Sequence, residues 1–178
     1  PAHGRCLPRQ HARVQLDRRR PYQNNASWAD VPYGQATLAS TGAAPVALAM
    51  AYVAATGDTE YTPVAFAQWA TDHDLTAAGT DTVASFLQQA GSAFGLAVEP
   101  VEVDAQTLRR AIVSNVPVLV VTQPGTFAPT TSVVVLDDID KDSRIVLHDP
   151  TSPSRSAKSW AFDDITDAAA LAFTVHEA

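Results

Sequence analysis

Apolar residues recur at helical spacing through the first half of the chain, and they predict three helices. Residues 46–55 are apolar on nearly every side, which is typical of a central buried helix, and Gly57 is expected to end it. Thr62 and Pro63 are a favourable start for a second helix that runs to Thr71. A third helix is predicted from Thr80-Asp81 onward, with an apolar face made by Val83, Phe86, Leu87 and Ala90.

After Gly95 the pattern changes to alternating and β-branched runs, which predict strands. Asp104 is expected to cap a short helix that carries Leu108, Ile112 and Val113. The acidic residues 137–142 are expected to form a polar hairpin connection. Helices followed by antiparallel strands predict an α+β domain of two layers, a helical layer packed on an antiparallel sheet. The expected strands are residues 97–103, 117–122, 132–136, 144–147 and 170–175, and residues 162–165 are expected to open a last turn or short helix.

Charge divides the chain into a basic leader and an acidic body. Residues 1–20 hold six arginines and one acid, lack any period, and are predicted to be a disordered leader that includes the single cysteine, Cys6. Residues 21–178 are predicted to form one domain, in which eighteen acidic side chains stand against six basic ones. This balance argues against nucleic acid as a partner. No run approaches the roughly 18 apolar residues of a membrane span, and what precedes Pro1 stays open.

The segment before the central helix is the strongest functional signal. Thr41 and Gly42 form a flexible turn, and Pro45 suits the first turn of the helix that follows. Such a junction points backbone N–H groups at whatever lies before it and favours developing negative charge. A cysteine hydrolase would carry its thiol at this place, where the chain has the methyl group of Ala43.

Several strings resemble a known family in their order along the chain. Residues 23–34 (QNNASWADVPYG) resemble a Q-x-D-x-x-W-x-x-x-x-Y-G pattern, residues 42–45 (GAAP) a G-C-G-P turn, and residues 49–57 an A-M-x-x-x-Y-x-x-G helix. Later matches are residues 62–70, 116–120, 136–140, 149–150 and 159–160. Over about residues 21–175 the chain resembles the C39-like peptidase family of bacterial papain-fold proteins.

The resemblance implies a papain-like cysteine peptidase fold in which the reactive positions are changed. The nucleophile position falls on Ala43, the base position on Ser132 (or on Thr131 if the alignment slips by one), and the acid position on Asp149. An acid only orients the imidazole, so its survival alone does not support hydrolysis. We therefore expect a degenerate, non-catalytic homologue that binds a peptide or cell-envelope ligand in the former cleft, with no cofactor or metal. Family members imply a bacterial, extracytoplasmic location.

Other residues near the turn remain candidates for chemistry or binding. By the resemblance Gln23 is a candidate oxyanion-hole amide, although a glutamine in this aromatic loop is equally expected to hold backbone groups together. Ser40, Thr41 and Gly42 are the other candidates for the expected cleft. Trp28 and Tyr33 could form the floor of a groove for peptide or sugar. An alternative is an active hydrolase that uses Ser40 or Thr41 as its nucleophile, and a third is a structural or assembly module without a ligand; the oligomeric state stays open.

The histidines and acidic clusters are not expected to bind metal. His148 and Asp149 directly follow the predicted strand 144–147. Adjacent residues of an extended segment point to opposite faces, which favours a solvated histidine over a shared site. His73 has the same difficulty with its neighbouring acids. Residues 137–142 lack the glycine and terminal glutamate of an EF-hand loop. A solvated turn is the expected structure there.

Overall fold

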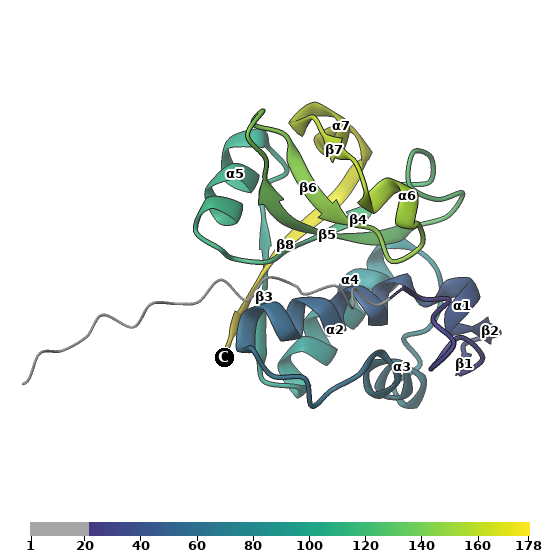
Figure 1. Cartoon of the computed structure of the whole chain (residues 1–178). Coiled ribbons are helices and arrows are strands. Elements are labelled where there is room, and N and C mark those ends of the chain that lie inside the picture. Colours follow the sequence, from purple (N-terminus) through teal and green to yellow (C-terminus); the bar gives the residue numbers. More distant parts are fainter. Residues whose placement is uncertain (1–21) are drawn as a thin grey trace, which may run out of the picture.

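The structure is a computed structural model that describes residues 22–178. The predicted leader and Cys6 lie outside the described residues. Within them the chain forms seven helices and eight strands, and Figure 1 shows their arrangement. The helices are α1 (Leu38–Thr41), α2 (Ala43–Thr56), α3 (Pro63–Asp72), α4 (Thr80–Ala93), α5 (Ala105–Val113), α6 (Pro153–Ser156) and α7 (Phe162–Ala168). The strands are β1 (Pro32–Tyr33), β2 (Ala36–Thr37), β3 (Leu96–Val101), β4 (Val118–Thr122), β5 (Ser132–Ile139), β6 (Ile145–His148), β7 (Ser159–Trp160) and β8 (Ala169–Glu177).

The main sheet has six strands in the order β3-β8-β4-β5-β6-β7. Every neighbouring pair in it is antiparallel. In the middle of the sheet Leu119 pairs with Val135 on one side and with Phe173 on the other. The expected α+β class with an antiparallel sheet is therefore confirmed.

One face of the sheet is covered by the three helices that the sequence predicts. Side chains of α2, α3 and α4 share a buried core with Leu119, Val121, Val133 and Val135 of the central strands. Residues 43–52 of α2 are all buried, as expected for a helix that is apolar nearly all round. Gly57 ends α2 in the left-handed conformation, with φ at 75°. This helix is the central element of the helical layer. Its first residue is Ala43, the position that the resemblance assigns to the nucleophile.

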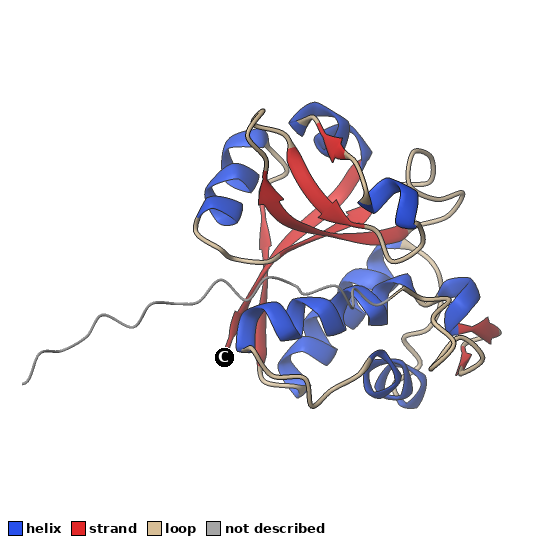
Figure 2. Ribbon diagram, in the orientation of Figure 1, coloured by secondary structure: helices blue, strands red, loops and turns tan. Residues whose placement is uncertain are grey.

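The opposite face of the sheet is also covered, so the expectation of two layers is wrong. Val118, Val120, Val134 and Leu136 point away from α2 and pack with α5 and α7 in a second core. Figure 2 shows α5 and α7 on the side of the sheet away from α2. Alternate residues of a strand face opposite sides, and here both sides are apolar. The consecutive apolar residues of β4 follow from this burial on two faces.

The connection between β5 and β6 begins later than the sequence predicts, because part of the acidic segment 137–142 belongs to β5. Strand β5 continues through Asp137 and Asp138 to Ile139, and the register with β6 shifts between Leu136 and Asp138. The turn is organised by Asp140, whose Oδ1 accepts hydrogen bonds from the backbone N–H groups of Asp142 and Arg144, both at 2.9 Å. A β-bulge thus lets polar residues join a strand that an alternation rule would end earlier.

Asp104 caps α5 as the sequence predicts, and this cap should depend on pH. Its Oδ1 accepts the Thr107 N–H at 2.9 Å. Hydrogen bonds from the side chain and backbone of Thr107 hold the pKa of the carboxyl below its usual value. A pKa that is lower in the folded chain contributes stability above the unfolded value of about 3.9, and that stability is lost as the pH falls through the folded value.

We expect Asp104→Ala to lower the melting temperature at pH 7, on the order of 2 °C. The difference from the unaltered chain should shrink as the pH is lowered from 7 toward 2, because protonation removes the negative acceptor from Asp104 in the unaltered chain, whereas the variant has no carboxylate there to lose. Thermal unfolding followed by circular dichroism at several pH values measures this. A difference of constant size across the range would show that the ionised cap is not its source.

Candidate functional site

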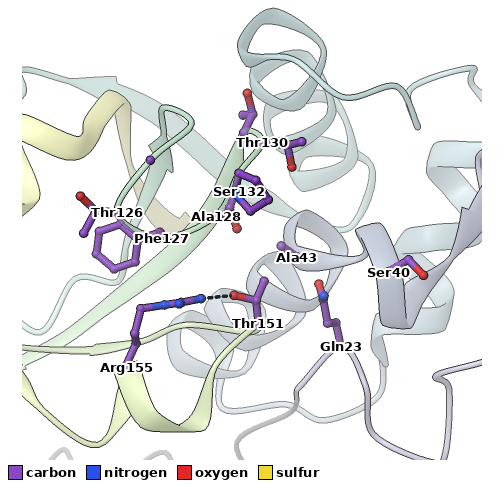
Figure 3. Close-up of a pocket in the computed structure, with 13 residues that line it drawn as sticks. Gln23, Ser40, Ala43, Thr126, Phe127, Ala128, Thr130, Ser132, Thr151 and Arg155 are labelled. Carbon is purple, nitrogen blue, oxygen red and sulfur yellow. Dashed lines mark hydrogen bonds between the residues drawn. The ribbon is translucent and has the colours of Figure 1, made fainter.

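A cavity of about 530 Å³ lies where the start of α2 meets the beginning of β5. Figure 3 shows the side chains that surround it. The segment between β4 and β5 forms one wall, the junction of α1 with α2 another, and the region of α6 a third. The lining residues are Gln23, Ser40, Ala43, Gly125, Thr126, Phe127, Ala128, Pro129, Thr130, Thr131, Ser132, Thr151 and Arg155.

Ala43 reaches the cavity because Gly42 allows α1 and α2 to approach closely. A Cβ atom on Gly42 would lie 2.5 Å from the carbonyl oxygen of Leu38 and 2.6 Å from its Cδ2. The φ of Gly42 is −84°, which any residue can adopt, so the need for glycine here is steric. Helix α2 then begins at Ala43 without a side-chain cap. The positive end of its macrodipole lies at the cavity wall.

Ser132 is the first residue of β5 and pairs with Thr122 of β4. It is only 3% exposed, and its Oγ has no hydrogen-bond partner among the described residues. Ser132, to which the family resemblance assigns the base position, lines the same cavity as Ala43. A second cavity of about 40 Å³ is also lined by both residues, which places them on a shared wall.

Both the backbone and the side chain of Gln23 form hydrogen bonds to backbone carbonyl groups. Its N–H donates to the carbonyl of Pro150 at 3.0 Å, and its Nε2 donates to the carbonyl of Ala39 at 2.8 Å. Its Oε1 is buried with no hydrogen-bond partner in the described part of the chain. The amide thus ties the segment before β1 to α1, and it leaves an acceptor beside the cavity.

Asp149 is fully buried and lies behind the cavity wall rather than on it. Its Oδ1 accepts hydrogen bonds from the N–H and the Oγ1 of Thr151, at 2.8 and 2.6 Å. Its Oδ2 accepts from Nε of Arg155 at 2.5 Å. The Nη2 of Arg155 donates to Thr151 Oγ1 at 2.7 Å (Figure 3). The carboxylate therefore orients a guanidinium at this site.

The expectation that His148 is solvated is wrong. The side chain is fully buried at the end of β6, and its ring centroid lies 4.7 Å from that of Tyr22. Tyr22, which precedes β1, packs against the imidazole. Asp149 lies beyond the end of β6, so alternation along a strand does not relate the two side chains. His73, in contrast, is exposed and stacks on Trp69 with centroids 3.8 Å apart.

The remaining candidate residues are distributed between the two cavities and the core. Ser40 is exposed on the larger cavity, with its Oγ 3.4 Å from that of Thr37. Thr41 is on the smaller cavity and donates to the carbonyl of Thr37 at 3.3 Å. Tyr33 lines the smaller cavity, where burial raises the pKa of its hydroxyl to about 12. Trp28 lines neither cavity, and its Nε1 donates to the carbonyl of Tyr22 at 2.9 Å.

The cavity can form hydrogen bonds but offers little acid–base chemistry. Hydroxyl groups dominate its lining, and among the described lining residues Arg155 is the one with an ionised side chain at neutral pH. A serine hydroxyl without an imidazole or carboxylate beside it is a poor nucleophile. No group of three or more His, Cys, Asp or Glu side chains in residues 22–178 is placed to hold a metal ion.

Sequence reasoning did not find Arg155, Thr151 or the cavity wall at residues 125–130, whereas Thr131, the alternative position for the base, does line the cavity. Nothing in their local pattern marks them, because Arg155 is held in position by Asp149 and Thr151, which precede α6, and these contacts are made only in the folded chain. Phe127 in that wall is 1% exposed and packs against Trp160 in a tilted arrangement, with ring centroids 4.9 Å apart. In the sequence, the one indication that this loop is fixed to the core is the apolar Phe127 among prolines and threonines.

Fold and site together define an α+β domain with a hydroxyl-lined cavity at the start of its central helix. No family model, curated protein or solved structure matches the chain. In the described part of the chain, none of the helices has the length and apolar character needed to cross a membrane.

Proposed function

We propose that this chain is a degenerate C39-like cysteine peptidase homologue with a papain-like fold, which binds a peptide or cell-envelope ligand without hydrolysing it. The observation that carries the proposal is that Ala43 and Ser132, assigned to the nucleophile and base by resemblance, line one cavity. These residues are 89 positions apart in sequence. A methyl group and a hydroxyl stand where attack and proton transfer would need a thiol and an imidazole.

The state of Asp149 supports the loss of hydrolysis. In a triad the acid holds an imidazole in the correct orientation, whereas Asp149 bonds to Arg155 and Thr151. Restoring a base at residue 132 would therefore leave the orienting acid engaged elsewhere. The rival nucleophiles Ser40 and Thr41 also lack a histidine partner among the described residues that line the two cavities.

The size of the cavity favours binding over a purely structural role. A module without a ligand is expected to fill its former cleft with its own side chains, but about 530 Å³ remains open here. This volume lies within the range of about 300–1,000 Å³ that is common for ligand sites. Its polar lining suits the N–H and C=O groups of an extended peptide.

The proposal is tested by incubating the protein with a pool of short peptides of mixed sequence and measuring retention and cleavage by mass spectrometry. We expect retained peptides and no cleavage. Thr130→Trp should abolish retention by filling the mouth of the cavity, since Thr130 is an exposed lining residue. Thr59→Trp is the matched control, because Thr59 is equally exposed and lies outside both cavities.

Two other outcomes would overturn the proposal. Cleavage that disappears in Ser40→Ala or Thr41→Ala would establish the rival hydrolase. Failure to retain any peptide, with the fold confirmed by thermal unfolding, would favour the structural module.

A further inference from the structure

Within residues 22–178, the side chains that line the larger cavity include no acidic one, although the body of the protein is acidic. Eighteen acidic and six basic side chains belong to residues 21–178. Among the described lining residues there is no Asp or Glu, and Arg155 is present. Because the surrounding surface repels anions on average, a lining of this kind marks a local exception. It favours a ligand group that is negatively charged or rich in acceptors.

The start of α2 adds a fixed positive potential at the same place. Helix α2 is 14 residues long and no side chain caps its first turn. Its first residue, Ala43, lines the cavity and presents only a methyl group. A thiolate or a carboxylate at this position would repel an incoming anion, whereas a methyl group leaves the positive helix end open to one.

Two buried polar atoms of residues in the cavity wall have no hydrogen-bond partner in the described part of the chain, and a ligand would supply the missing hydrogen bonds. Ser132 is 3% exposed, and its unpartnered Oγ can donate to an acceptor. The unpartnered Oε1 of Gln23 can only accept, so it requires an N–H or O–H group from the ligand. Leaving such buried atoms unpaired is costly. A ligand that satisfies both carries an acceptor and a donor.

Arg155 supplies further hydrogen-bond donors for acceptor groups of a ligand. Its Nε and one Nη2 N–H bond to Asp149 and Thr151, and three further N–H groups belong to the guanidinium. Its side chain is 29% exposed and lies on the cavity. Since Asp149 already offsets the charge of Arg155, we assign the attraction mainly to the start of α2 and to directed hydrogen bonds.

We infer that the cavity binds the free C-terminal carboxylate of a peptide next to Ala43. The carboxylate accepts hydrogen bonds from Ser132 and Arg155 at the positive end of α2, and the last amide N–H of the peptide donates to Gln23 Oε1. A C-terminal residue is a small group that carries both functions within reach of each other. This inference rests on the proposed function and specifies the ligand end that the cavity recognises.

The test uses two pools of pentapeptides with the same mixed sequences, one with free C-terminal carboxylates and one with C-terminal amides. The full chain is immobilised, and the retained peptides are quantified by mass spectrometry. We expect the free acids to be retained on the order of tenfold more than the amides. Ser132→Ala should reduce retention of the free acids several-fold.

Ala43→Asp provides a charge test, with Ala43→Asn as the neutral control of the same size. A carboxylate at the start of α2 favours the helix, so loss of binding in Ala43→Asp cannot be attributed to unfolding when its melting temperature is unchanged or higher. Ala43→Asp should abolish the preference for free acids, whereas Ala43→Asn should retain part of it. Equal retention of acids and amides by the unaltered chain would overturn this inference and leave peptide binding intact. Retention of neither pool would overturn the proposed function as well.

Discussion

Gly42→Ala lowers the free energy of unfolding by about 3 kcal/mol, because the new methyl group meets backbone that cannot move aside. The added Cβ would lie 2.5 Å from the Leu38 oxygen and 2.8 Å from Leu38 Cα. Alanine is intrinsically a better helix former than glycine by up to about 1 kcal/mol, and the φ of −84° is acceptable for it. Helix propensity therefore predicts that Gly42→Ala raises the free energy of unfolding, whereas the steric clash predicts that it lowers it. We expect the clash to have the larger effect.

Urea denaturation of the variant measures this loss, and Gly57→Ala is the matched control. Gly57 has a φ of 75° and nothing within 4 Å of its added Cβ, so its replacement costs only the left-handed conformation, about 1 kcal/mol. The Gly42 variant should also lose peptide retention, since α1 and the start of α2 must separate to relieve the clash. A stabilised Gly42→Ala protein would contradict the packing described at this junction.

Arg155→Met is expected to destabilise the protein by about 2–4 kcal/mol, because it leaves a buried carboxylate without its charged partner. Asp149 is fully buried and would retain only its bonds from Thr151. The flexible methionine side chain replaces much of the volume of the arginine stem, so the loss reports on the charge. The measurement is again urea denaturation at neutral pH.

Lys141→Met tests the same change of residue type at an exposed ion pair. Lys141 and Asp142 are 2.9 Å apart, but their side chains are 87% and 63% exposed. We expect a loss of about 0.5 kcal/mol or less, since water and salt screen such pairs. The double variant Asp149→Asn, Arg155→Met should recover part of the stability lost in Arg155→Met, because the buried charge is then absent. If Arg155→Met and Lys141→Met lowered the free energy of unfolding equally, this result would contradict the buried character of the Asp149–Arg155 pair.

Much of the secondary structure follows from local pattern alone. The burial of α2 is encoded in an apolar run that has no polar face, and the cap at Asp104 is encoded in residue type and position. The number of layers was predicted wrongly, because a short apolar run such as 118–121 fits a strand that is buried on one face as well as a strand that is buried on both. Only the packing of α5 and α7 shows that its alternate side chains face two cores.

The candidate site could be predicted only where residue type carries the signal. The turn at Gly42 and Ala43 was visible because it combines glycine, proline and an apolar helix, and the cavity is located there. Arg155 was not visible, since an exposed arginine and one that pairs with a buried acid look alike in sequence. His148 was misjudged for the same reason: its burial depends on Tyr22, which comes from a distant part of the chain.

The position of β8 sets a condition on the order of events during synthesis. This strand comes after all the other elements in the sequence, yet it lies between β3 and β4 in the sheet. During synthesis, β3, α2 and the residues of the cavity walls therefore leave the ribosome before β8, the strand that joins β3 to β4. Until β8 emerges, β3 has no partner in the sheet, and the apolar edge of β4 is open to pairing with another chain. We expect ribosome-bound chains that stop before residue 169 to recruit chaperones, and chains that expose residue 177 to be released from them.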